Sequence, residues 1–397
     1  PTVSILALCP MPSSFSVILS LPSVFIDNFS QLITNILPQS VCSQGSPDKE
    51  ITFVDAIKGE IKLPENIHDI VLLKKDGIPT YHFAHAIDDH LMRTTTVVRG
   101  GEWLASAPIH YELFHLLGFK MPAYAHTAHL MKFDEETGGK RKLSKRKDPE
   151  LSLDYYRKDG YHPYTMKVYL LTLLNSNFEE WHEKFPDKDI NEFPFSVEKM
   201  NQSGALFDKD KLHNICKNEL SKLSEEELYD FLYDWAKENE PENVEKWFGD
   251  REKMLQILRL YMGVGAKRRR KDLMYAKQIF ELISYFFDGE SAEEMDEFKL
   301  DEDMVSKILK SYLAKYDHND DNSVWFNKLK EIADEHGFAS DMKAYKANPE
   351  NFKGNVSDIA EAVRIAVTGR ANTPDLWTIV HIMGEEQMTE RIKKHIK

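Results

Sequence analysis

Beyond about residue 220 the apolar residues recur with the spacing of an α-helix, and this periodicity constrains the fold more than any other feature of the chain. Four stripes follow the i, i+3, i+4, i+7 pattern that places apolar side chains on one face of a helix. Such faces must be buried against one another, so the C-terminal half is predicted to be a helical bundle. The stripes are Leu228-Phe231-Leu232-Trp235, Met254-Ile257-Leu258-Tyr261, Ile279-Leu282-Ile283-Phe286 and Val305-Ile308-Leu309-Tyr312.

Helix boundary signals agree with this prediction. Ser224 precedes Glu227 by three residues, which is the spacing of a capping box. Thr373-Pro374 and Gly384 similarly bracket a short helix that would contain Leu376, Ile379, Val380 and Met383.

The chain before the bundle reads differently. From Ile51 to about residue 147, short β-like runs at 70–73 and 96–98 are followed by turn residues, which indicates a mixed α/β region. Residues 1–47 are rich in Ser, Pro and aliphatic residues and contain a single charge, Asp27. No Lys or Arg precedes their apolar run and Pro22 interrupts it, so we expect no membrane role and assign this segment no function.

Composition excludes several classes of protein. The chain has 397 residues with 42% hydrophobic and 11% aromatic residues, which predicts two to four folded domains and not a disordered chain. Cys9, Cys42 and Cys216 are too few and too scattered for a disulfide framework or a four-thiolate zinc site, which favours a reducing, cytoplasmic compartment. The net charge of −14 argues against a surface that coats nucleic acid throughout, although local basic patches remain possible.

The strongest chemical signal is a basic segment, GGKRKLSKRK, at residues 138–147. Six of its last eight residues are cationic and none is acidic. A flexible cationic loop can close on a polyphosphate and stabilise developing charge. A solvated basic patch or a nucleic-acid contact is the alternative reading. Neither the P-loop motif nor a complete dinucleotide fingerprint occurs in the chain.

Residues 81–90, YHFAHAIDDH, bring together three histidines and two aspartates. A metal-dependent hydrolase is therefore one hypothesis. However, His82 and His85 would lie on opposite faces of a strand, and no HExxH motif is present. A polar pocket or a packing role is favoured.

Arg99-Gly100-Gly101-Glu102-Trp103 has the composition of a recognition turn. Arginine can bind a carboxylate through two nitrogens, glycine permits close backbone approach, and tryptophan offers a flat surface. A surface arginine beside a core tryptophan explains these residues equally well.

A second basic run, Lys267-Arg268-Arg269-Arg270-Lys271, lies between two helical stripes. It is either a contact for the phosphate backbone of a nucleic acid or a solvated helix end.

Five segments, in this order, resemble the bacterial-type glutamyl-tRNA synthetases. The resemblance implies a class I aminoacyl-tRNA synthetase, which forms glutamyl-adenylate from glutamate and ATP and transfers the glutamyl group to the 3′ end of tRNA(Glu). The segments are DGIPTYHFAHAIDDHLMRTTTVVRGGEWLASAPIHYELFHLLGF (76–119), KLSKRK (142–147), LSLDYYRKDGYHP (151–163), GALFDKDKL (204–212) and AVRIAVTGRANTPDLWTIVHIMG (362–384).

The resemblance also implies roles for single residues. The basic segment corresponds to the KMSKS loop, in which Lys145, helped by Lys142, contacts the phosphates of ATP and stabilises departing pyrophosphate. Magnesium is expected to arrive with the nucleotide, and no protein-bound zinc is expected. The glutamate site would include Tyr81, His85 and Arg99, and the ATP site Glu102, Trp103, Leu130, Lys142, Ser144, Lys145 and Arg146.

Two positions depart from the family pattern. His85 stands where Asn is common, and Arg93 where Gly is usual. In addition, residues 1–47 contain nothing like the HIGH motif or the first strands of the nucleotide-binding fold. We therefore expect little or no activity from this exact chain, and a catalytically inactive tRNA-binding fragment is the alternative function.

For architecture, the resemblance implies a partial Rossmann-like α/β catalytic domain followed by helical domains. Its partners would be tRNA(Glu), glutamate and ATP, and a cytoplasmic monomer is expected. The expected parts are an unassigned segment (1–47), a remnant of the acceptor-binding insertion (48–80), the second half of the catalytic fold (81–147), a stem-contact segment (148–222) and a helical anticodon-binding domain (223–397).

Overall fold

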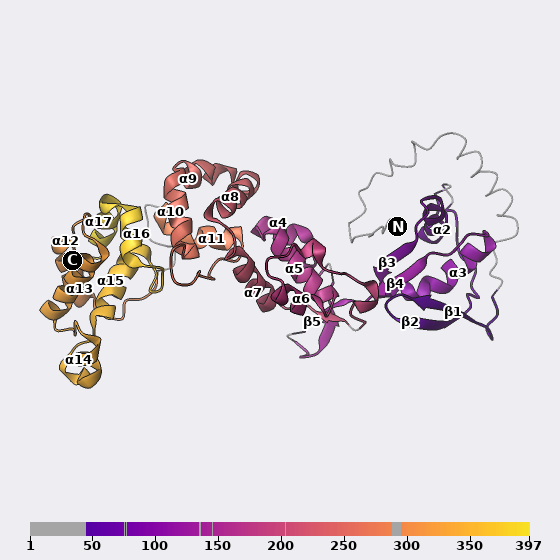
Figure 1. The fold of residues 1–397 in the computed structure, drawn as a ribbon, viewed down its shortest axis with the longest axis horizontal. Coiled ribbons are helices and arrows are strands. Elements are labelled where there is room, and N and C mark those ends of the chain that lie inside the picture. Colours follow the sequence, from indigo (N-terminus) through magenta and orange to yellow (C-terminus); the bar gives the residue numbers. More distant parts are fainter. Residues whose placement is uncertain are drawn as a thin grey trace. The chain divides into compact units, whose positions relative to one another are not determined.

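The computed structural model describes residues 45–74, 76, 78–134, 136–144, 146–202, 204–287 and 295–397 (Figure 1). The chain divides into two compact units. The first unit runs to Asp148 and includes Val168–Asp208, and the second comprises Pro149–Lys167 and Lys209–Lys397. No helix in the described part of the chain is long and apolar enough to cross a membrane.

The first unit contains a four-stranded mixed sheet in the order β2-β1-β4-β3. Strands β1 and β2 form an antiparallel hairpin, whereas β4 is parallel to both β1 and β3. Helix α3 connects β3 to β4, as a crossover between neighbouring parallel strands requires. The elements are β1 (Glu50–Asp55), β2 (Gly59–Pro64), α2 (Tyr81–Leu91), β3 (Thr96–Gly100), α3 (Ala107–Leu116) and β4 (Ala123–Thr127).

Apolar clusters among the described residues hold this unit together, and two of them lie between the sheet, α2 and α3. Phe83 and Ile87 of α2 pack with Leu113 and Phe114 of α3. The second cluster joins the sheet to the start of α3 and contains Ile51, Phe53, Val97, Ala107 and Tyr124. Strands β3 and β4 thereby lie beside α2 and α3 (Figure 1).

The β-run expected at residues 96–98 is confirmed as β3, but the run expected at 70–73 is wrong. Residues 70–73 form no strand, and Leu73 makes only an isolated bridge to Pro79. Leu72 instead packs in the cluster between α2 and α3. Its apolar character reflects burial against helices and not pairing in a sheet.

A small second sheet, in the order β6-β5-β7, changes the interpretation of the basic segment. Lys140–Lys142 is strand β6 and pairs antiparallel with β5, so the segment begins as one arm of a hairpin and not as a loop. The remaining elements near this sheet are β5 (Leu130–Phe133), α5 (Pro163–Leu174), α6 (Phe178–Lys184) and β7 (Ala205–Leu206).

The second unit is the predicted helical bundle. The apolar stripes lie on the buried faces of α8, α10, α11 and α12, and the third stripe continues from α11 into the 3₁₀ turn Ser284–Phe286. The helices are α4 (Leu153–Asp159), α7 (Lys209–Leu220), α8 (Glu225–Asn239), α9 (Val244–Phe248), α10 (Arg251–Met262), α11 (Ala276–Ile283), α12 (Glu302–Lys315), α13 (Asn322–His336), α14 (Met342–Ala347), α15 (Val356–Thr368), α16 (Leu376–Met383) and α17 (Glu385–Lys393).

The predicted helix boundaries hold. The Ser224 hydroxyl accepts a hydrogen bond from the Glu227 amide at 3.2 Å, and a Glu227 carboxylate oxygen accepts one from the Ser224 amide at 2.8 Å. This is the expected capping box of α8. Gly384 follows the last residue of α16, while the N-cap of that helix is Asp375.

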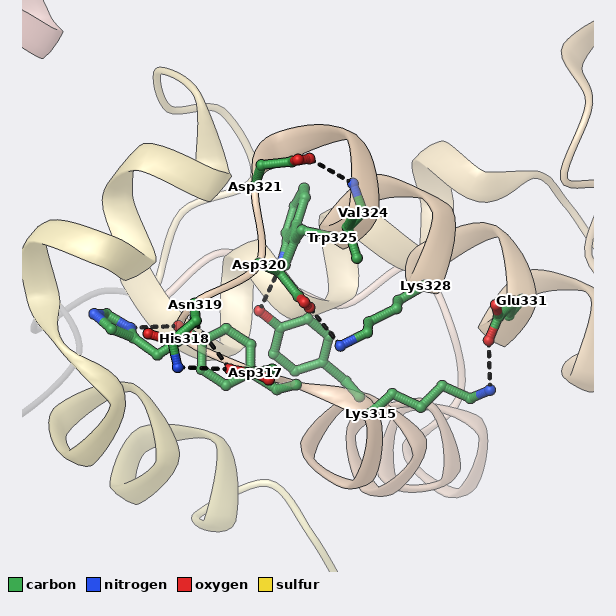
Figure 2. Close-up of polar contacts among 12 residues, drawn as sticks. Lys315, Asp317, His318, Asn319, Asp320, Asp321, Val324, Trp325, Lys328 and Glu331 are labelled. Carbon is green, nitrogen blue, oxygen red and sulfur yellow. Dashed lines mark hydrogen bonds and ion pairs between the residues drawn. The ribbon is translucent and has the colours of Figure 1, made fainter.

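Polar contacts fix α12 against α13 (Figure 2). Asp321 caps α13 by accepting from the Val324 amide at 2.9 Å. The Trp325 indole nitrogen donates to the Tyr312 hydroxyl at 3.0 Å, and Lys315 pairs with Glu331 at 2.9 Å. The buried indole therefore has a partner, as its desolvation requires.

Candidate active site

A chain of hydrogen bonds passes through Arg99, which β3 places in the interior of the first unit. Only 9% of Arg99 is exposed. Its Nε donates to Nε2 of His126 at 2.9 Å, and its Nη1 lies 3.0 Å from Nδ1 of His110. Its guanidinium carbon also lies 4.5 Å from the centre of the Tyr124 ring, a cation–π distance.

His126 is held in turn by Asp55. The parallel pairing of β1 with β4 brings Asp55 beside His126. Oδ2 of Asp55 accepts from the His126 amide at 3.0 Å and lies 2.6 Å from its Nδ1. Burial opposes ionisation of Asp55, but the hydrogen bonds from His126 and from the backbone outweigh it and keep the pKa of Asp55 below its usual value.

His110 of α3 supports Arg99 from a different side and is completely buried. Its Nε2 lies 2.9 Å from Nδ1 of His82 on α2. Burial, and then the nearby positive charges, lower the pKa of His110 to about 2. His110 is therefore a neutral imidazole at ordinary pH.

One face of α2 completes the site. Nδ1 of His85 lies 2.5 Å from an Asp89 carboxylate oxygen, and its Nε2 lies 2.7 Å from the Tyr124 hydroxyl. Tyr81 stacks on His85 and its ring centre lies 4.4 Å from that of Trp103. Because residues 81–91 form a helix and not a strand, His82 and His85 do not diverge, and both rings contact His110.

Within the described residues, Nη2 of Arg99 has no hydrogen-bond partner although it is buried. A buried guanidinium nitrogen without a partner is costly and calls for an explanation. The arrangement suits an anionic ligand, and a carboxylate matches the geometry of a guanidinium group best.

The histidine and aspartate cluster does not present a set of metal ligands. No group of three or more His, Cys, Asp or Glu residues in the described ranges could hold a metal ion. The ring nitrogens of His110 and His126 are already engaged with Arg99, His82 and Asp55.

Asp148, a residue that sequence reasoning missed, organises the hairpin of β5 and β6 in which the basic segment begins. This carboxylate is 1% exposed and contacts the Arg141 guanidinium at 2.6 and 2.7 Å, the Ser144 amide at 2.8 Å and the Lys132 ammonium at 3.4 Å. Hydrogen bonding to Arg141 is the main reason that the pKa of Asp148 lies well below its usual value. The signal was an acidic residue directly after a basic run.

The structure brings several predicted ATP-site residues together. The Lys142 ammonium lies 3.9 Å from Glu102, whose carboxylate also lies 3.3 Å from His129. The amide of Leu143 donates to the carbonyl of Leu130 at 3.0 Å. Trp103 belongs to the turn after β3, and Ser144 and Arg146 follow the hairpin. Lys145 lies outside the described residues.

The second basic run follows α10 in the second unit. Arg270 pairs with Asp272 at 2.6 Å and Lys271 donates to the Asn218 side chain at 2.7 Å, whereas Lys267, Arg268 and Arg269 are exposed. An open cavity of about 740 Å³ lies beside the run, and its lining includes Arg259, Arg268, Arg270, His318, Asp375 and His381.

Comparison with known proteins shows similarity to aminoacyl-tRNA synthetases in two parts of the chain. Residues 39–214 match the catalytic domain of class I tRNA synthetases (E and Q), and residues 227–396 match an anticodon binding domain. A glutamate–tRNA ligase of Acetivibrio thermocellus is 54% identical over 354 residues. The chain is thus similar to a glutamate–tRNA ligase over most of its length.

A second glutamate–tRNA ligase, of Clostridium perfringens, is 46% identical over 359 residues. Both alignments cover 89% of this chain and 64% of the relative, so the chain spans just under two thirds of these relatives.

A crystal structure of a glutamate–tRNA ligase from Elizabethkingia meningosepticum, in complex with its amino acid, has a TM-score of 0.63 at 24% identity. The match covers 95% of this chain and 71% of the Elizabethkingia chain. At this identity it supports the fold alone. The expected class, a partial α/β catalytic domain followed by a helical anticodon-binding domain, is thereby confirmed.

Proposed function

We propose that the chain acts as a glutamate–tRNA ligase, activating glutamate with ATP and passing the glutamyl group to the 3′ end of tRNA(Glu). The similarity to glutamate–tRNA ligases and the match to the class I catalytic domain support this proposal. The observation that carries it is the buried Arg99 guanidinium, which is held by two histidines and has one nitrogen without a partner. Such a group is suited to an amino acid with a carboxylate side chain.

In the proposed glutamate site, Arg99 binds a substrate carboxylate through Nη2. Tyr81 and His85 form a wall beside it, and their rings are parallel within 6°. Asp89 keeps the His85 ring in place, so the wall is rigid. A preformed site of this kind loses little conformational entropy when the ligand binds.

In the proposed ATP site, Glu102, Trp103 and Leu130 lie beside the nucleotide. The phosphates are bound by Lys142, Ser144, Lys145 and Arg146, with Lys142 and Lys145 as the catalytic residues. Positive side chains act here by stabilising charge that grows on the phosphates. Magnesium accompanies the nucleotide and neutralises phosphate charge when it is bound. The ion pair between Glu102 and Lys142 keeps this lysine beside the site.

The helical domains would contact tRNA(Glu). Residues 148–222 are assigned to stem contact and 223–397 to anticodon binding, with Lys267, Arg268, Arg269 and Arg270 contacting the phosphate backbone. We also propose that the chain is a monomer in the cytoplasm.

Calorimetric titration of the 397-residue chain with glutamate tests the amino-acid site. We expect Arg99→Gln to weaken binding about 30-fold or more, because it removes a buried charge partner of the carboxylate. Arg251→Gln, which changes an exposed arginine in the second unit, is the matched control and should bind as the parent does. Equal affinities for the parent and Arg99→Gln would contradict the proposed site.

Glutamate-dependent ATP–pyrophosphate exchange with added tRNA separates the two functional alternatives. Exchange that Lys142→Ala abolishes supports the ligase and would contradict the expectation that this exact chain has little or no activity. Tight tRNA binding without exchange supports a catalytically inactive tRNA-binding fragment.

Charge reversal tests the proposed tRNA contact. We expect Arg268→Glu combined with Arg269→Glu to lower tRNA affinity and to flatten its dependence on salt, because fewer counterions are released on binding. Lys343→Glu combined with Lys346→Glu changes the net charge equally on α14 and serves as the control. An unchanged salt slope would remove the basic run from the tRNA-binding surface.

A further inference from the structure

We propose that Asp55 and His126 are positioning residues for Arg99, which orient its guanidinium group so that Nη2 remains free for the substrate carboxylate. The inference rests on the proposed glutamate site. The observation behind it is an unbroken hydrogen-bonded path, Asp55–His126–Arg99–His110–His82, which crosses β1, β4, β3, α3 and α2.

The direction of every bond in this path follows from Arg99. A guanidinium group can only donate, so Nε2 of His126 and Nδ1 of His110 must both be acceptors. His126 therefore carries its proton on Nδ1, which points at Asp55 from 2.6 Å. His110 carries its proton on Nε2 and donates to His82.

Both carboxylate oxygens of Asp55 are engaged in hydrogen bonds. Its Oδ1 accepts from the amides of Ile57 and Lys58 at 3.0 and 2.9 Å, and its Oδ2 faces the amide and Nδ1 of His126. The residue is 1% exposed. This carboxylate therefore selects the tautomer of His126 in which Nε2 is an acceptor.

Two hydrogen bonds in the plane of a guanidinium, together with its bond to the rest of the side chain, are enough to orient the group. Nε of Arg99 is held by His126 and Nη1 by His110, so the position of Nη2 is determined by the plane of the guanidinium. Without the acceptor on His126, the guanidinium can rotate about its last side-chain bonds. Binding a carboxylate would then cost additional conformational entropy.

Three variants test this assignment by glutamate titration. Asp55→Asn presents a donor where His126 needs an acceptor, and His126→Leu removes the acceptor for Arg99. We expect each to weaken glutamate binding about tenfold or more, because each disturbs a hydrogen bond to a charged group. His126→Gln can supply an oxygen near the position of Nε2, so we expect it to bind within about threefold of the parent. Asp321→Asn makes the same chemical change at a helix cap of the second unit and should have no effect.

Nitrogen NMR of the isotope-labelled chain reports which ring nitrogen of His126 carries the proton. A purely structural role of Asp55 would leave this proton in place. In the parent we expect a proton on Nδ1 of His126 and slow exchange of the Arg99 Nε proton. Asp55→Asn should move the His126 proton to Nε2 and accelerate exchange at Arg99. Circular dichroism establishes which variants fold, and if Asp55→Asn does not, the contrast between His126→Leu and His126→Gln decides.

The outcomes separate this inference from the proposed function. A proton on Nε2 of His126 in the parent, or full glutamate affinity in a folded His126→Leu variant, would overturn the positioning role. If the parent binds no glutamate, the proposed amino-acid site fails, and the tautomer together with the Arg99 exchange rate alone decides whether Asp55 and His126 orient the guanidinium.

Discussion

Asp148 contacts both terminal nitrogens of Arg141, at 2.7 and 2.6 Å, and so joins the end of the basic segment to the strand where it begins. The same carboxylate accepts from the Ser144 amide between them. Two described residues of the proposed phosphate-binding segment, Arg141 and Ser144, are therefore held together by one carboxylate.

We expect Asp148→Asn to loosen this segment. The substitution removes a two-nitrogen ion pair, which we estimate to lower the free energy of unfolding of the first unit by about 1–2 kcal/mol and also to weaken ATP binding. Denaturant unfolding and ATP titration measure the two effects. Glu136→Gln, an exposed charge change in the same hairpin, should leave both unchanged. An Asp148→Asn variant with normal ATP affinity would show that the segment does not depend on this anchor.

Arg93 has a φ of 56°, and among the described residues it is the only non-glycine residue with positive φ. A side chain in this left-handed region costs roughly 1 kcal/mol, which glycine avoids. We therefore expect Arg93→Gly to raise the free energy of unfolding by about 0.5–1 kcal/mol. Arg93→Ala keeps the Cβ atom and should bring no such gain. A gain of equal size in both variants would attribute the effect to loss of the arginine charge.

Acidification should destabilise the first unit through His110. Its pKa is about 2 in the folded chain and near 6.5 when unfolded, so the unfolded state binds more protons as the pH falls below about 6.5. One such group contributes at most about 3 kcal/mol of lost stability between about pH 6.5 and pH 4.

His110→Asn isolates this contribution because it can keep an acceptor for Arg99 but does not titrate. Its unfolding free energy, measured across the same range, should fall less steeply than that of the parent. Parallel curves would show that His110 does not account for the acid sensitivity.

Cys216 should be inert while the chain is folded. Its thiol is completely buried beside Thr165, and burial raises the pKa of Cys216 to about 11. Near neutral pH, Cys216 therefore forms about 100-fold less reactive thiolate than an ordinary thiol of pKa 9. Mass spectrometry of the Cys216 peptide after iodoacetamide treatment, with and without denaturant, measures the difference. Equal labelling in both conditions would contradict the buried position.

The capping box of α8 makes a separate contribution to the second unit. Ser224→Ala removes the hydroxyl that accepts from the Glu227 amide and should cost about 1 kcal/mol. Thermal unfolding measures this change. Ser323→Ala, at an exposed position in the first turn of α13, is the control. A similar loss of stability in this variant would show that the effect of Ser224→Ala does not come from the cap of α8.

The helical half of the chain could be predicted because a period of 3.6 residues sets which side chains share a face. Leu228 and Leu232 of α8 are completely buried, as their spacing indicated. The run at 70–73 was misassigned because four apolar residues carry no period that distinguishes a strand from a segment packed on helices.

The candidate site was predictable only in part. Arg99 and Tyr81 follow from the resemblance, and the structure places both beside His110. Their partners do not follow from sequence, because His126 is 27 residues from Arg99 and 71 from Asp55. Contacts at such separations depend on strand order, which local patterns do not encode.

The imidazoles that hold Arg99 have consequences for the heat of ligand binding. His126 and His110 each use one ring nitrogen to accept from Arg99, so a proton added at either nitrogen would break a hydrogen bond to the guanidinium. An anion that docks on the free nitrogen would thus meet a guanidinium held by two buried rings. His110, which stays neutral, would add no buffer-dependent contribution to the enthalpy of that encounter.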